Sequence, residues 1–428
     1  MEDDFDVIVV GGGFAGCASA LLLARAGLNV ALLERAATPG GKSLSGGRLY
    51  AHALEAILPG FSEHAPLERK ITREKLTLMN ADSAATLDYH HAPGPDGTSS
   101  YSVLRSRFDP WLMAQAEHAG AQCLCGIRVD ELVTEQGCVR GIRTGDDILR
   151  ARVVILAEGA NTLLGEKHGL IAKPAPRTMA IGVKEVISLP RQCIEDRFGL
   201  EENQGAAWLF AGDASAGEVG GGFLYTNRDT LSLGVVCNLA AFNANARNLP
   251  AMLENFKRHP AVRPLLRGGE LLEYGARLIP EGGLDSMPAP SGAGYLIVGD
   301  AARLCVNAGH TVRGMDLAVL SAQAAAQAVM DALSNDDVSA AGLRGYTDLL
   351  HQGALGAVLR QYRRLPETLL ASPHFFRRYP QLTNDLLRDL FRVNGDAPQP
   401  LRRILWRHAR QAGWRNLFND VIRGLRSL

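Results

Sequence analysis

The sequence predicts an α/β fold, α+β overall, in which a parallel sheet is combined with an antiparallel sheet and a helical C-terminal region. Three observations predict it: a glycine-rich turn between a strand and a helix at the N-terminus, a second apolar strand that ends in Gly-Asp near residue 300, and short strands between the two that are separated by Gly, Asn and Asp turns. The 428 residues, 46% of them apolar, can bury a large core and form two or three regions.

The N-terminal segment has the order of elements that a Rossmann dinucleotide site requires. Residues 5–10 form a β-branched apolar run that ends at Gly11-Gly12-Gly13-Phe14-Ala15-Gly16. A helix over 15–26 follows, and then a strand over 29–33 that is followed by Glu34. Strand, glycines, helix, strand and acid in this order predict a bound dinucleotide more specifically than the glycines alone.

Each residue type in this motif has a physical role. Gly11 permits the tight turn, Gly13 lets the backbone approach a pyrophosphate, and Gly16 lets the helix pack close to the strand. The helix N-terminus then offers free N–H groups and partial positive charge to the phosphates. Glu34 is expected to accept hydrogen bonds from the ribose hydroxyls of adenosine.

Two downstream segments complete a glutathione-reductase-like FAD-binding domain. The strand over 295–298 ends at Gly299 and Asp300, and a helix over 315–333 follows. The Asp300 carboxylate is predicted to hold the ribityl hydroxyls of FAD, although it could instead cap the following segment. The helix start at Gly314 and Met315 is predicted to stabilise negative charge on the reduced ring. The strand over 153–156 and the turn at Ala157, Glu158 and Gly159 resemble the strand and turn that return the chain beside the dinucleotide in this flavoprotein class, with Glu158 where aspartate is usual.

Only one dinucleotide motif is present, so a second domain for a nicotinamide cofactor is not expected. After a Gly- and Ser-rich loop over 39–48, the next hundred residues lack regular βαβ repeats and are predicted to be irregular. Electrons therefore come from a transiently bound nicotinamide, a substrate or another protein.

Several strings of residues together resemble the FixC-like branch of the electron-transfer flavoprotein:quinone oxidoreductases. The most specific are G-G-R-L-Y-A-H over 46–52 and G-G-G-F-L-Y-T-N over 220–227, with S-V-L-R-S-R-F-D over 102–109 and T-V-R-G-M-D over 311–316. The resemblance implies noncovalent FAD, oxidation of a reduced two-subunit electron-transfer flavoprotein, and electron transfer to quinone or a ferredoxin-like partner. It places Arg105 at the FAD phosphates, Val129 at the adenine, and Arg48 with the loop 45–47 beside the flavin.

The sequence departs from the wider family in two ways. No cysteine follows Cys305, so the four-cysteine iron–sulfur domain of the larger quinone oxidoreductases is not expected, and a separate small ferredoxin-like protein could supply the cluster. Asn307 stands where proline is common, beside His310, which could tune the ring, shuttle a proton or be an ordinary loop histidine. The residues predicted to bind FAD are Gly11, Gly13, Phe14, Ala15, Gly16, Glu34, Arg35, Lys42, Gly47, Arg48, Arg105, Val129, Ala157, Glu158, Gly159, Gly299, Asp300, Gly314 and Met315.

The predicted domains are discontinuous. Residues 1–55, 100–180 and 280–335 are assigned to the FAD-binding domain, 56–99 and 181–279 to an antiparallel-sheet domain, with strands at 182–186, 206–210, 223–226 and 231–236, and 336–428 to a helical region. An alternative on the same scaffold is a geranylgeranyl-reductase-like or hydroxylase-like enzyme acting on a small molecule or lipid.

Charge and cysteine usage bear on location and partners. The seven cysteines are scattered and odd in number, which predicts neither disulfides nor metal ligands. The acidic N-terminus is unlike a signal peptide, so a cytoplasmic location is expected. Residues 357–428 carry 14 Arg against 5 acidic residues. A basic helical stretch over 401–425, interrupted at Gly413, could cap the fold, lie on the inner face of the membrane or bind an acidic protein, and no nucleic-acid motif accompanies it.

Overall fold

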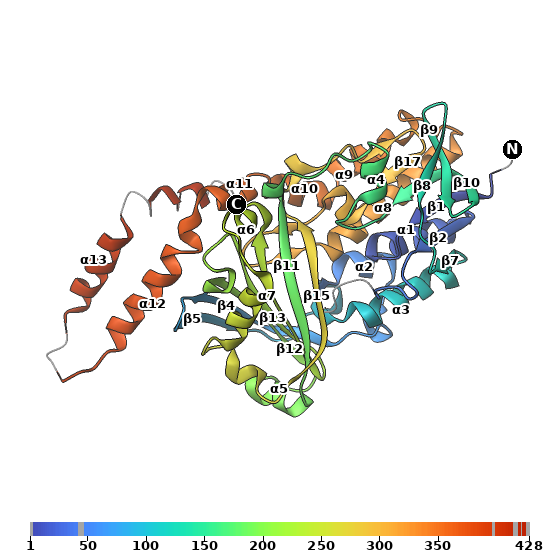
Figure 1. The fold of residues 1–428 in the computed structure, drawn as a ribbon. Helices are drawn as coiled ribbons and strands as arrows, with labels where there is room; N and C mark the ends of the chain where they lie inside the picture. Colours follow the sequence, from blue (N-terminus) through green and yellow to red (C-terminus); the bar gives the residue numbers. More distant parts are fainter. Residues whose placement is uncertain (1–2, 42–46, 396–398, 414–417, 421, 425–428) are drawn as a thin grey trace. The chain divides into compact units, whose positions relative to one another are not determined.

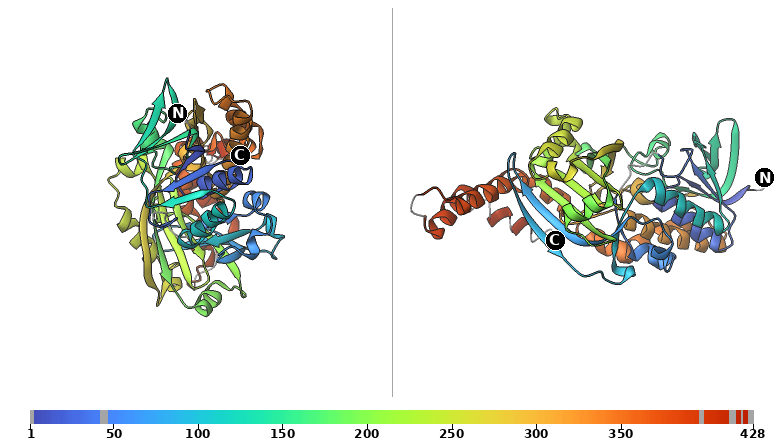
Figure 2. Two further views of the ribbon diagram at one scale, coloured as in Figure 1. Left: turned by 90° about the vertical axis from the view of Figure 1, so that its right-hand side faces the viewer. Right: turned by 90° about the horizontal axis from the view of Figure 1, so that it is seen from below.

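The chain forms two compact units (Figures 1 and 2). The computed structural model describes residues 3–41, 47–395, 399–413, 418–420 and 422–424. The first unit comprises 1–68, 94–175 and 278–360, and the second comprises 69–93, 176–277 and 361–428. The sequence-based division kept 336–428 apart as a third region. Instead, 336–360 belongs to the first unit, where the buried Tyr346 hydroxyl donates to the Ile297 carbonyl at 2.7 Å, and 361–428 belongs to the second.

A parallel sheet is the core of the first unit. Its strand order is β16 (Ser291–Gly292), β17 (Tyr295–Ile297), β10 (Asp147–Leu156), β1 (Phe5–Val10), β2 (Val30–Glu34) and β7 (Gln122–Cys125). All neighbours are parallel except β16 and β17. β8 (Glu131–Glu135) and β9 (Cys138–Thr144) extend β10 as an antiparallel hairpin. Residues 7–9 are fully buried, which confirms the predicted buried strand.

Three long helices pack in this unit. α1 (Phe14–Arg25) contacts both α3 (Arg105–His118) and α8 (Met315–Ser334). By length and composition α8 could cross a membrane, and 56% of its apolar 18-residue stretch is buried inside the protein. Its Ser321 hydroxyl donates to the Ala318 carbonyl and accepts from the Gly299 amide, so a polar residue that interrupts the apolar run is used internally.

The stretch after Arg48 is not irregular, so that expectation was wrong. Within the first unit it contains β3 (Gly47–Tyr50), α2 (His52–Ile57) and β6 (Ser100–Val103), with β3 and β6 paired antiparallel. The unit also holds α4 (Leu163–Lys167), the short hairpin of β18 (Val306–Asn307) and β19 (Val312–Arg313), α9 (Gly345–Gln352) and most of α10 (Ala354–Gln361). The prediction failed because it was based on the lack of βαβ repeats, and the elements of this stretch, which include α3, are regular without forming such repeats.

The second unit is built on an extended sheet. Its order is β15 (Glu270–Pro280), β11 (Met179–Ser188), β14 (Thr230–Asn238), β13 (Gly220–Thr226), β12 (Gln204–Gly212) and β4 (Arg69–Met79), with β5 (Ala84–His90) paired to β4. β12 and β4 are parallel, whereas β11–β14, β14–β13, β13–β12 and β4–β5 are antiparallel. The four predicted strands are confirmed, since each lies within one of the strands β11 to β14. Trp208, Phe210, Leu233 and Phe256 belong to the core, to which α5 (Arg191–Phe198) and α7 (Leu249–Arg258) contribute.

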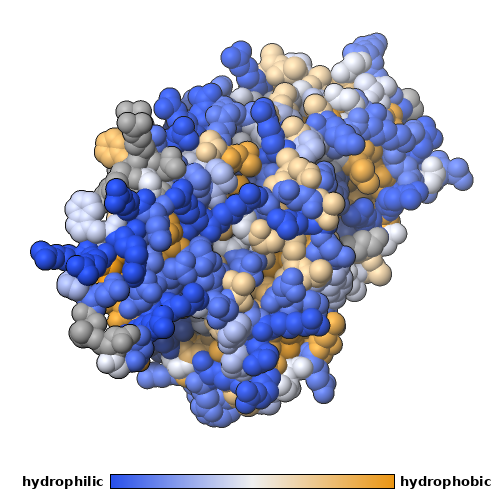
Figure 3. Space-filling model, turned by 60° about the vertical axis from the view of Figure 1, so that its left-hand side comes forward, coloured by the Kyte–Doolittle hydropathy of each residue, from blue (hydrophilic) through white to orange (hydrophobic). Residues whose placement is uncertain are grey.

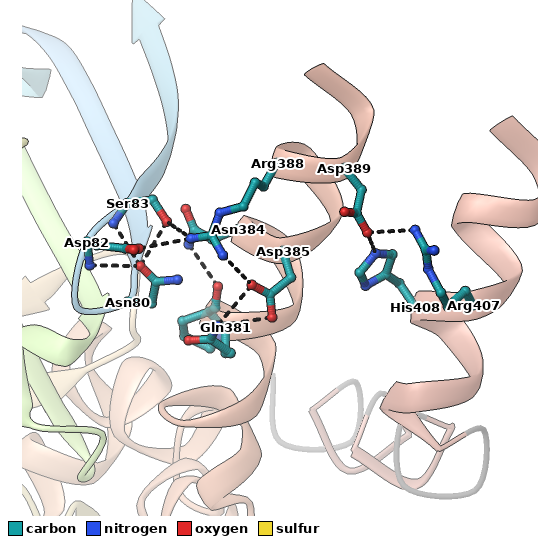
Figure 4. Close-up of polar contacts among 11 residues, drawn as sticks. Asn80, Asp82, Ser83, Gln381, Asn384, Asp385, Arg388, Asp389, Arg407 and His408 are labelled. Carbon is teal, nitrogen blue, oxygen red and sulfur yellow. Dashed lines mark hydrogen bonds and ion pairs between the residues drawn. The ribbon is translucent and has the colours of Figure 1, made fainter. Parts of the chain in front are cut away.

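The C-terminal helices attach to this sheet through polar contacts. α11 (Leu365–Ala371) leads to α12 (Arg378–Phe391), where Asn384 Nδ2 donates to the Leu78 carbonyl at 3.0 Å. Arg388 of α12 pairs with Asp82 at 3.0 Å, a contact drawn in Figure 4. α13 (Leu401–Ala412) lies beside α12 and ends at Gly413, whose φ is +76°. The predicted interruption at Gly413 is therefore present. Trp414, Leu417, Val421 and Leu425 of the predicted helix lie outside the described residues.

Candidate functional site

The glycine turn lies at the carboxyl ends of β1 and β10. Gly11 has φ of +112°, and a Cβ there would lie 2.3 Å from the Ala157 oxygen. A Cβ at Gly16 would lie 1.9 Å from the Gly11 oxygen, so both positions require glycine for close packing. Gly13 differs, because its nearest neighbour would be Arg105 Nη2 at 3.6 Å. The first turn of α1 thus leaves room beside a cation, which suits a pyrophosphate.

Arg105 supplies that cation at the start of α3. Its Nε and Nη2 donate to the two carboxylate oxygens of Asp109 at 2.6 and 2.7 Å, and its guanidinium lies 4.8 Å from the centre of the Phe14 ring. Phe14 in turn stacks on Phe108 at 5.1 Å. Burial alone would lower the pKa of Arg105, but Asp109 and, more weakly, Asp300 outweigh it and raise the pKa. Nη1 takes no part in the pair with Asp109.

Glu34 is held at the end of β2. Its Oε2 accepts from the Gly12 amide at 2.8 Å and its Oε1 from the Ala36 amide at 2.8 Å, which orients the carboxylate beside the glycine turn. The Ile127 amide donates to the Glu34 carbonyl at 3.0 Å, so the segment that leads to the half-buried Val129 runs beside the same strand end. Arg35 is exposed.

The end of β17 contacts the first turn of α1. The Gly299 amide donates to Ser321 Oγ at 3.0 Å, and a Cβ on Gly299 would lie 2.9 Å from the Ala15 Cβ. Asp300 follows, half-buried, and its charge raises the pKa of both Arg105 and Cys305, in each case as a secondary contribution. The predicted phosphate-side and ribityl-side residues therefore surround the same helix N-terminus.

The Glu158 carboxylate is engaged elsewhere. Its two oxygens accept from the amides of Leu164 and Gly165 in the first turn of α4, at 2.8 and 3.0 Å. Burial raises the pKa of Glu158, and these hydrogen bonds oppose the rise. The neighbouring Gly159 has φ of +74°, a left-handed conformation that favours glycine in the turn after β10.

The start of α8 meets β3. A Cβ on Gly47 would lie 3.2 Å from Met315 Cε, and Gly314 is the residue before the first turn of α8. In β3, Arg48 Nε donates to Ser100 Oγ at 3.0 Å, and the guanidinium lies 4.7 Å from the centre of the Tyr50 ring. Lys42, Ser45 and Gly46 lie outside the described residues.

His310 is exposed on the loop before α8, where its Nδ1 lies 3.1 Å from the Ala308 carbonyl. The neighbouring Asn307 donates to Glu281 at 3.1 Å, a contact that sequence reasoning missed. Burial raises the pKa of Glu281, opposed by this hydrogen bond. Among the described residues no three His, Cys, Asp or Glu side chains are grouped to hold a metal ion.

Sequence reasoning also missed a contact between two of the resembling strings. His52, which ends G-G-R-L-Y-A-H, lies 3.7 Å from the carboxylate of Asp316, which ends T-V-R-G-M-D. Arg313 Nε donates to the same Asp316 oxygen at 2.7 Å. The strings carried this signal, but their proximity depends on the packing of α2 against α8.

Comparison with known proteins decides the family. The sequence model of the ETF-QO, ubiquinone-binding domain matches residues 179–279, that of the ETF-QO/FixC family C-terminal domain matches 365–428, and that of FAD dependent oxidoreductases matches 6–94. The protein named probable electron transfer flavoprotein-quinone oxidoreductase YdiS of Escherichia coli (strain K12) is 50% identical over 428 residues, with 100% of each chain covered. Protein FixC of the same strain is 50% identical over 428 residues, with 99% of each chain covered. The chain belongs to the ETF-QO/FixC family.

Membership of the ETF-QO/FixC family confirms the resemblance and makes the chain an FAD-dependent oxidoreductase. A solved structure of a geranylgeranyl bacteriochlorophyll reductase-like protein from Thermoplasma acidophilum has a TM-score of 0.71 at 18% identity, covering 98% of this chain and 99% of that one. The flavin-dependent brominase Bmp2 has a TM-score of 0.65 at 17% identity, covering 95% and 99%. These two likenesses confirm the predicted fold class.

Proposed function

We propose that the protein accepts electrons from a reduced electron-transfer flavoprotein and passes them through FAD to a quinone. The observation that carries this proposal is the 50% identity, over the whole length of both chains, to a relative named as such an oxidoreductase. The match of residues 179–279 to the ubiquinone-binding domain supports quinone as the acceptor.

In this proposal FAD lies along the first unit. The amides at Gly13 and the guanidinium of Arg105 bind its pyrophosphate, Glu34 binds the adenosine ribose and Val129 lies at the adenine. Asp300 binds the ribityl chain, and the ring lies near Arg48 and Met315. When bound, FAD supplies transfer of one or two electrons. The other residues assigned to this site are Gly11, Phe14, Ala15, Gly16, Arg35, Lys42, Gly47, Ala157, Glu158, Gly159, Gly299 and Gly314, with His310 near the ring.

Stopped-flow reduction with different donors tests the donor. We expect NADH and NADPH to reduce the bound flavin slowly or not at all, because the single dinucleotide motif is assigned to FAD. A reduced two-subunit electron-transfer flavoprotein is expected to react quickly, because only the approach of flavin edges is needed. Fast, saturable reduction by a nicotinamide would contradict the proposal and favour a reductase or hydroxylase acting on a small molecule or lipid.

The acceptor is tested from the reduced protein. Rapid reoxidation by a water-soluble ubiquinone analogue, with no ferredoxin present, is the expected result. The comparison is reoxidation by a small ferredoxin, since a ferredoxin-like partner is proposed as the second route for electrons. Reoxidation by ferredoxin but not by the quinone analogue would contradict quinone as the direct acceptor.

We propose a cytoplasmic location with peripheral contact of α12 and α13 at the inner face of the membrane. Phe391, Val393 and Trp406 are 76, 94 and 64% exposed. Trp406 lies in α13, which carries Arg402, Arg403, Arg407 and Arg410, and Phe391 ends α12. The face of the molecule that Figure 3 draws is mostly hydrophilic, with hydrophobic side chains among the hydrophilic ones. Exposed aromatic and apolar residues combined with arginines suit an anionic lipid surface.

Sedimentation with vesicles tests this contact. Binding to phosphatidylglycerol-containing vesicles is expected to exceed binding to phosphatidylcholine vesicles, and Trp406→Ser should weaken it. Leu87→Ser, which changes an exposed residue of β5, is the matched control. Equal binding of the parent and the Trp406 variant, or none to either vesicle, would contradict membrane contact through these helices.

A further inference from the structure

A buried carboxylate, a cation and a half-exposed histidine meet at the start of α8. Asp316 lies in the first turn of α8, with a side chain that is fully buried. Its Oδ2 accepts from Arg313 Nε at 2.7 Å and lies 2.5 Å from Arg313 Nη2. The same oxygen is 3.7 Å from Nε2 of His52, the first residue of α2. Oδ1 of Asp316 is buried and has no hydrogen-bond partner among the described residues.

The charges around His52 leave it able to gain a proton. The charges of Asp316 and Arg313 largely neutralise each other. The pair by itself therefore neither strongly favours nor strongly disfavours the protonated form of the His52 imidazole. Burial lowers the pKa of His52, Asp316 opposes this, and Arg313 adds to it. Of the other nearby charged residues, Glu55 of α2 accepts from the Gly60 amide, and Arg48 of β3 donates to Ser100. Burial therefore favours the neutral form of the His52 imidazole. Its side chain is 44% exposed, so solvent can deliver a proton.

We propose that His52 is a redox-linked proton-binding residue, which takes up a proton from solvent when the FAD site gains negative charge and releases it when the electrons leave. The inference rests on the proposed FAD site, in which the flavin ring lies near Met315, the residue directly before Asp316 on α8. His52 reaches that helix end from α2, and α2 packs against α8. Added negative charge nearby favours the protonated imidazole, and the partly buried setting screens this effect less than bulk water would.

The electrons and protons balance. Two electrons and one proton taken up by bound FAD add one negative charge to the site, and a second proton from solvent binds the His52 imidazole. Reduction of a quinone to a quinol consumes two electrons and two protons. Oxidation of the site by quinone therefore removes the two electrons and both protons, one from the flavin and one from His52. Without a titrating His52, the same reduction takes up one proton fewer.

Spectroelectrochemical titration of the FAD-loaded protein between pH 5 and 9 measures this proton directly. For a two-electron couple, each proton taken up shifts the midpoint potential by about 30 mV per pH unit. In the plot of midpoint potential against pH, the parent is expected to show a steeper segment, where two protons are taken up with two electrons. This segment begins below the ordinary His pKa of about 6.5 and ends above it. His52→Asn should show one proton throughout that segment.

Two further variants make the test specific. His64→Asn removes a histidine that is 80% exposed in the same unit, and it should keep the parental slope. Asp316→Asn leaves Arg313 unopposed, so the pKa of His52 should fall and the steep segment should move to lower pH. Identical slopes in parent and His52→Asn, both with FAD bound, would overturn the inference. Failure of the parent to bind FAD at all would instead overturn the proposed function.

Discussion

Gly13, at the start of α1, has no side chain on the side that faces Arg105. A Cβ added there would lie 3.6 Å from its nearest neighbour, Arg105 Nη2. Gly13→Val would fill this space with a branched side chain, so we expect FAD affinity to be lost while the unit still folds. Titration of apoprotein with FAD, followed by flavin fluorescence, measures the affinity. Gly345→Val is the control, since nothing lies within 4 Å of a Cβ there. Parental affinity in the Gly13 variant would reject the site.

Asp300, which follows the end of β17, offers a graded test of the same site. Asp300→Ala removes hydrogen bonds between the ribityl hydroxyls and a charged acceptor, which corresponds to a loss of about 1 to 3 kcal/mol in binding. The same titration should therefore give FAD affinity between those of the parent and of Gly13→Val. An Asp300 variant that binds FAD as tightly as the parent would show that this carboxylate only caps the segment after β17.

How much of the site the sequence could predict depends on how far apart in the chain the interacting residues are. Gly11, Gly13, Gly16 and Glu34 are close in sequence, and their spacing alone predicts the strand–turn–helix geometry that the structure has. The contact of His52 with Asp316 joins residues that are far apart in the chain, and it is created by helix packing. The attachment of Glu158 to α4 was missed because either a ligand or a backbone amide can satisfy a carboxylate in a turn.

Among the elements, β4 and β5 were missed and α1 and α8 were predicted, and composition explains the difference. α1 and α8 are dominated by buried Ala, Leu and Val. β4 contains Arg69, Arg73 and Lys75, and β5 is mostly exposed, so neither has the apolar alternation that predicts a strand. Two of the charged residues of β4 pair across to β5: Arg73 Nη2 lies 2.7 Å and Lys75 Nζ 3.1 Å from Asp88. Arg69 instead pairs with Glu195 of α5 at 3.0 Å.

This charge cluster should make the β4–β5 hairpin sensitive to acid. The hydrogen bond from Arg73, against some burial and with help from Lys75, lowers the pKa of Asp88 to about 2. A depressed carboxyl pKa contributes stability above the unfolded value of about 3.9, and that stability is lost as the pH falls toward 2. Because Asp88 is partly exposed, Asp88→Asn is expected to cost only about 1 kcal/mol at pH 7.

Hydrogen exchange of the β5 amides at pH 7, and unfolding midpoints measured at pH 7 and pH 2.5, check this expectation. The unfolding midpoints of the parent and of Asp88→Asn should differ at pH 7, and this difference should shrink at pH 2.5. Asp229→Asn, in an exposed turn of the same unit, is the control and should match the parent at both pH values. A difference that persists unchanged at pH 2.5 would mean that the Asp88 charge is not its source.

At the scale of the whole molecule, one cofactor is assigned to one of two compact units, and this predicts how ligand binding changes stability. A ligand that binds only the folded state stabilises it by about 2.7 kcal/mol at a hundred times its Kd. In the proposed site, β1, α1 and β2 bind the adenosine and the pyrophosphate of FAD, and FMN contains neither of these groups. FAD should therefore raise the melting temperature of the apoprotein, whereas FMN at the same concentration should leave it nearly unchanged.

Thermal melts of apoprotein with each flavin, together with chromatography of the cofactor released on denaturation, test this prediction. The purified protein is expected to be yellow and to release FAD. Gly13→Val separates binding at the glycine turn from nonspecific stabilisation, because it should lose the FAD-induced shift and otherwise melt like the parental apoprotein. Recovery of FMN alone, or equal shifts with FMN and FAD, would contradict the assignment, since a site that ignores the adenosine half would not need the strand–turn–helix that begins the chain.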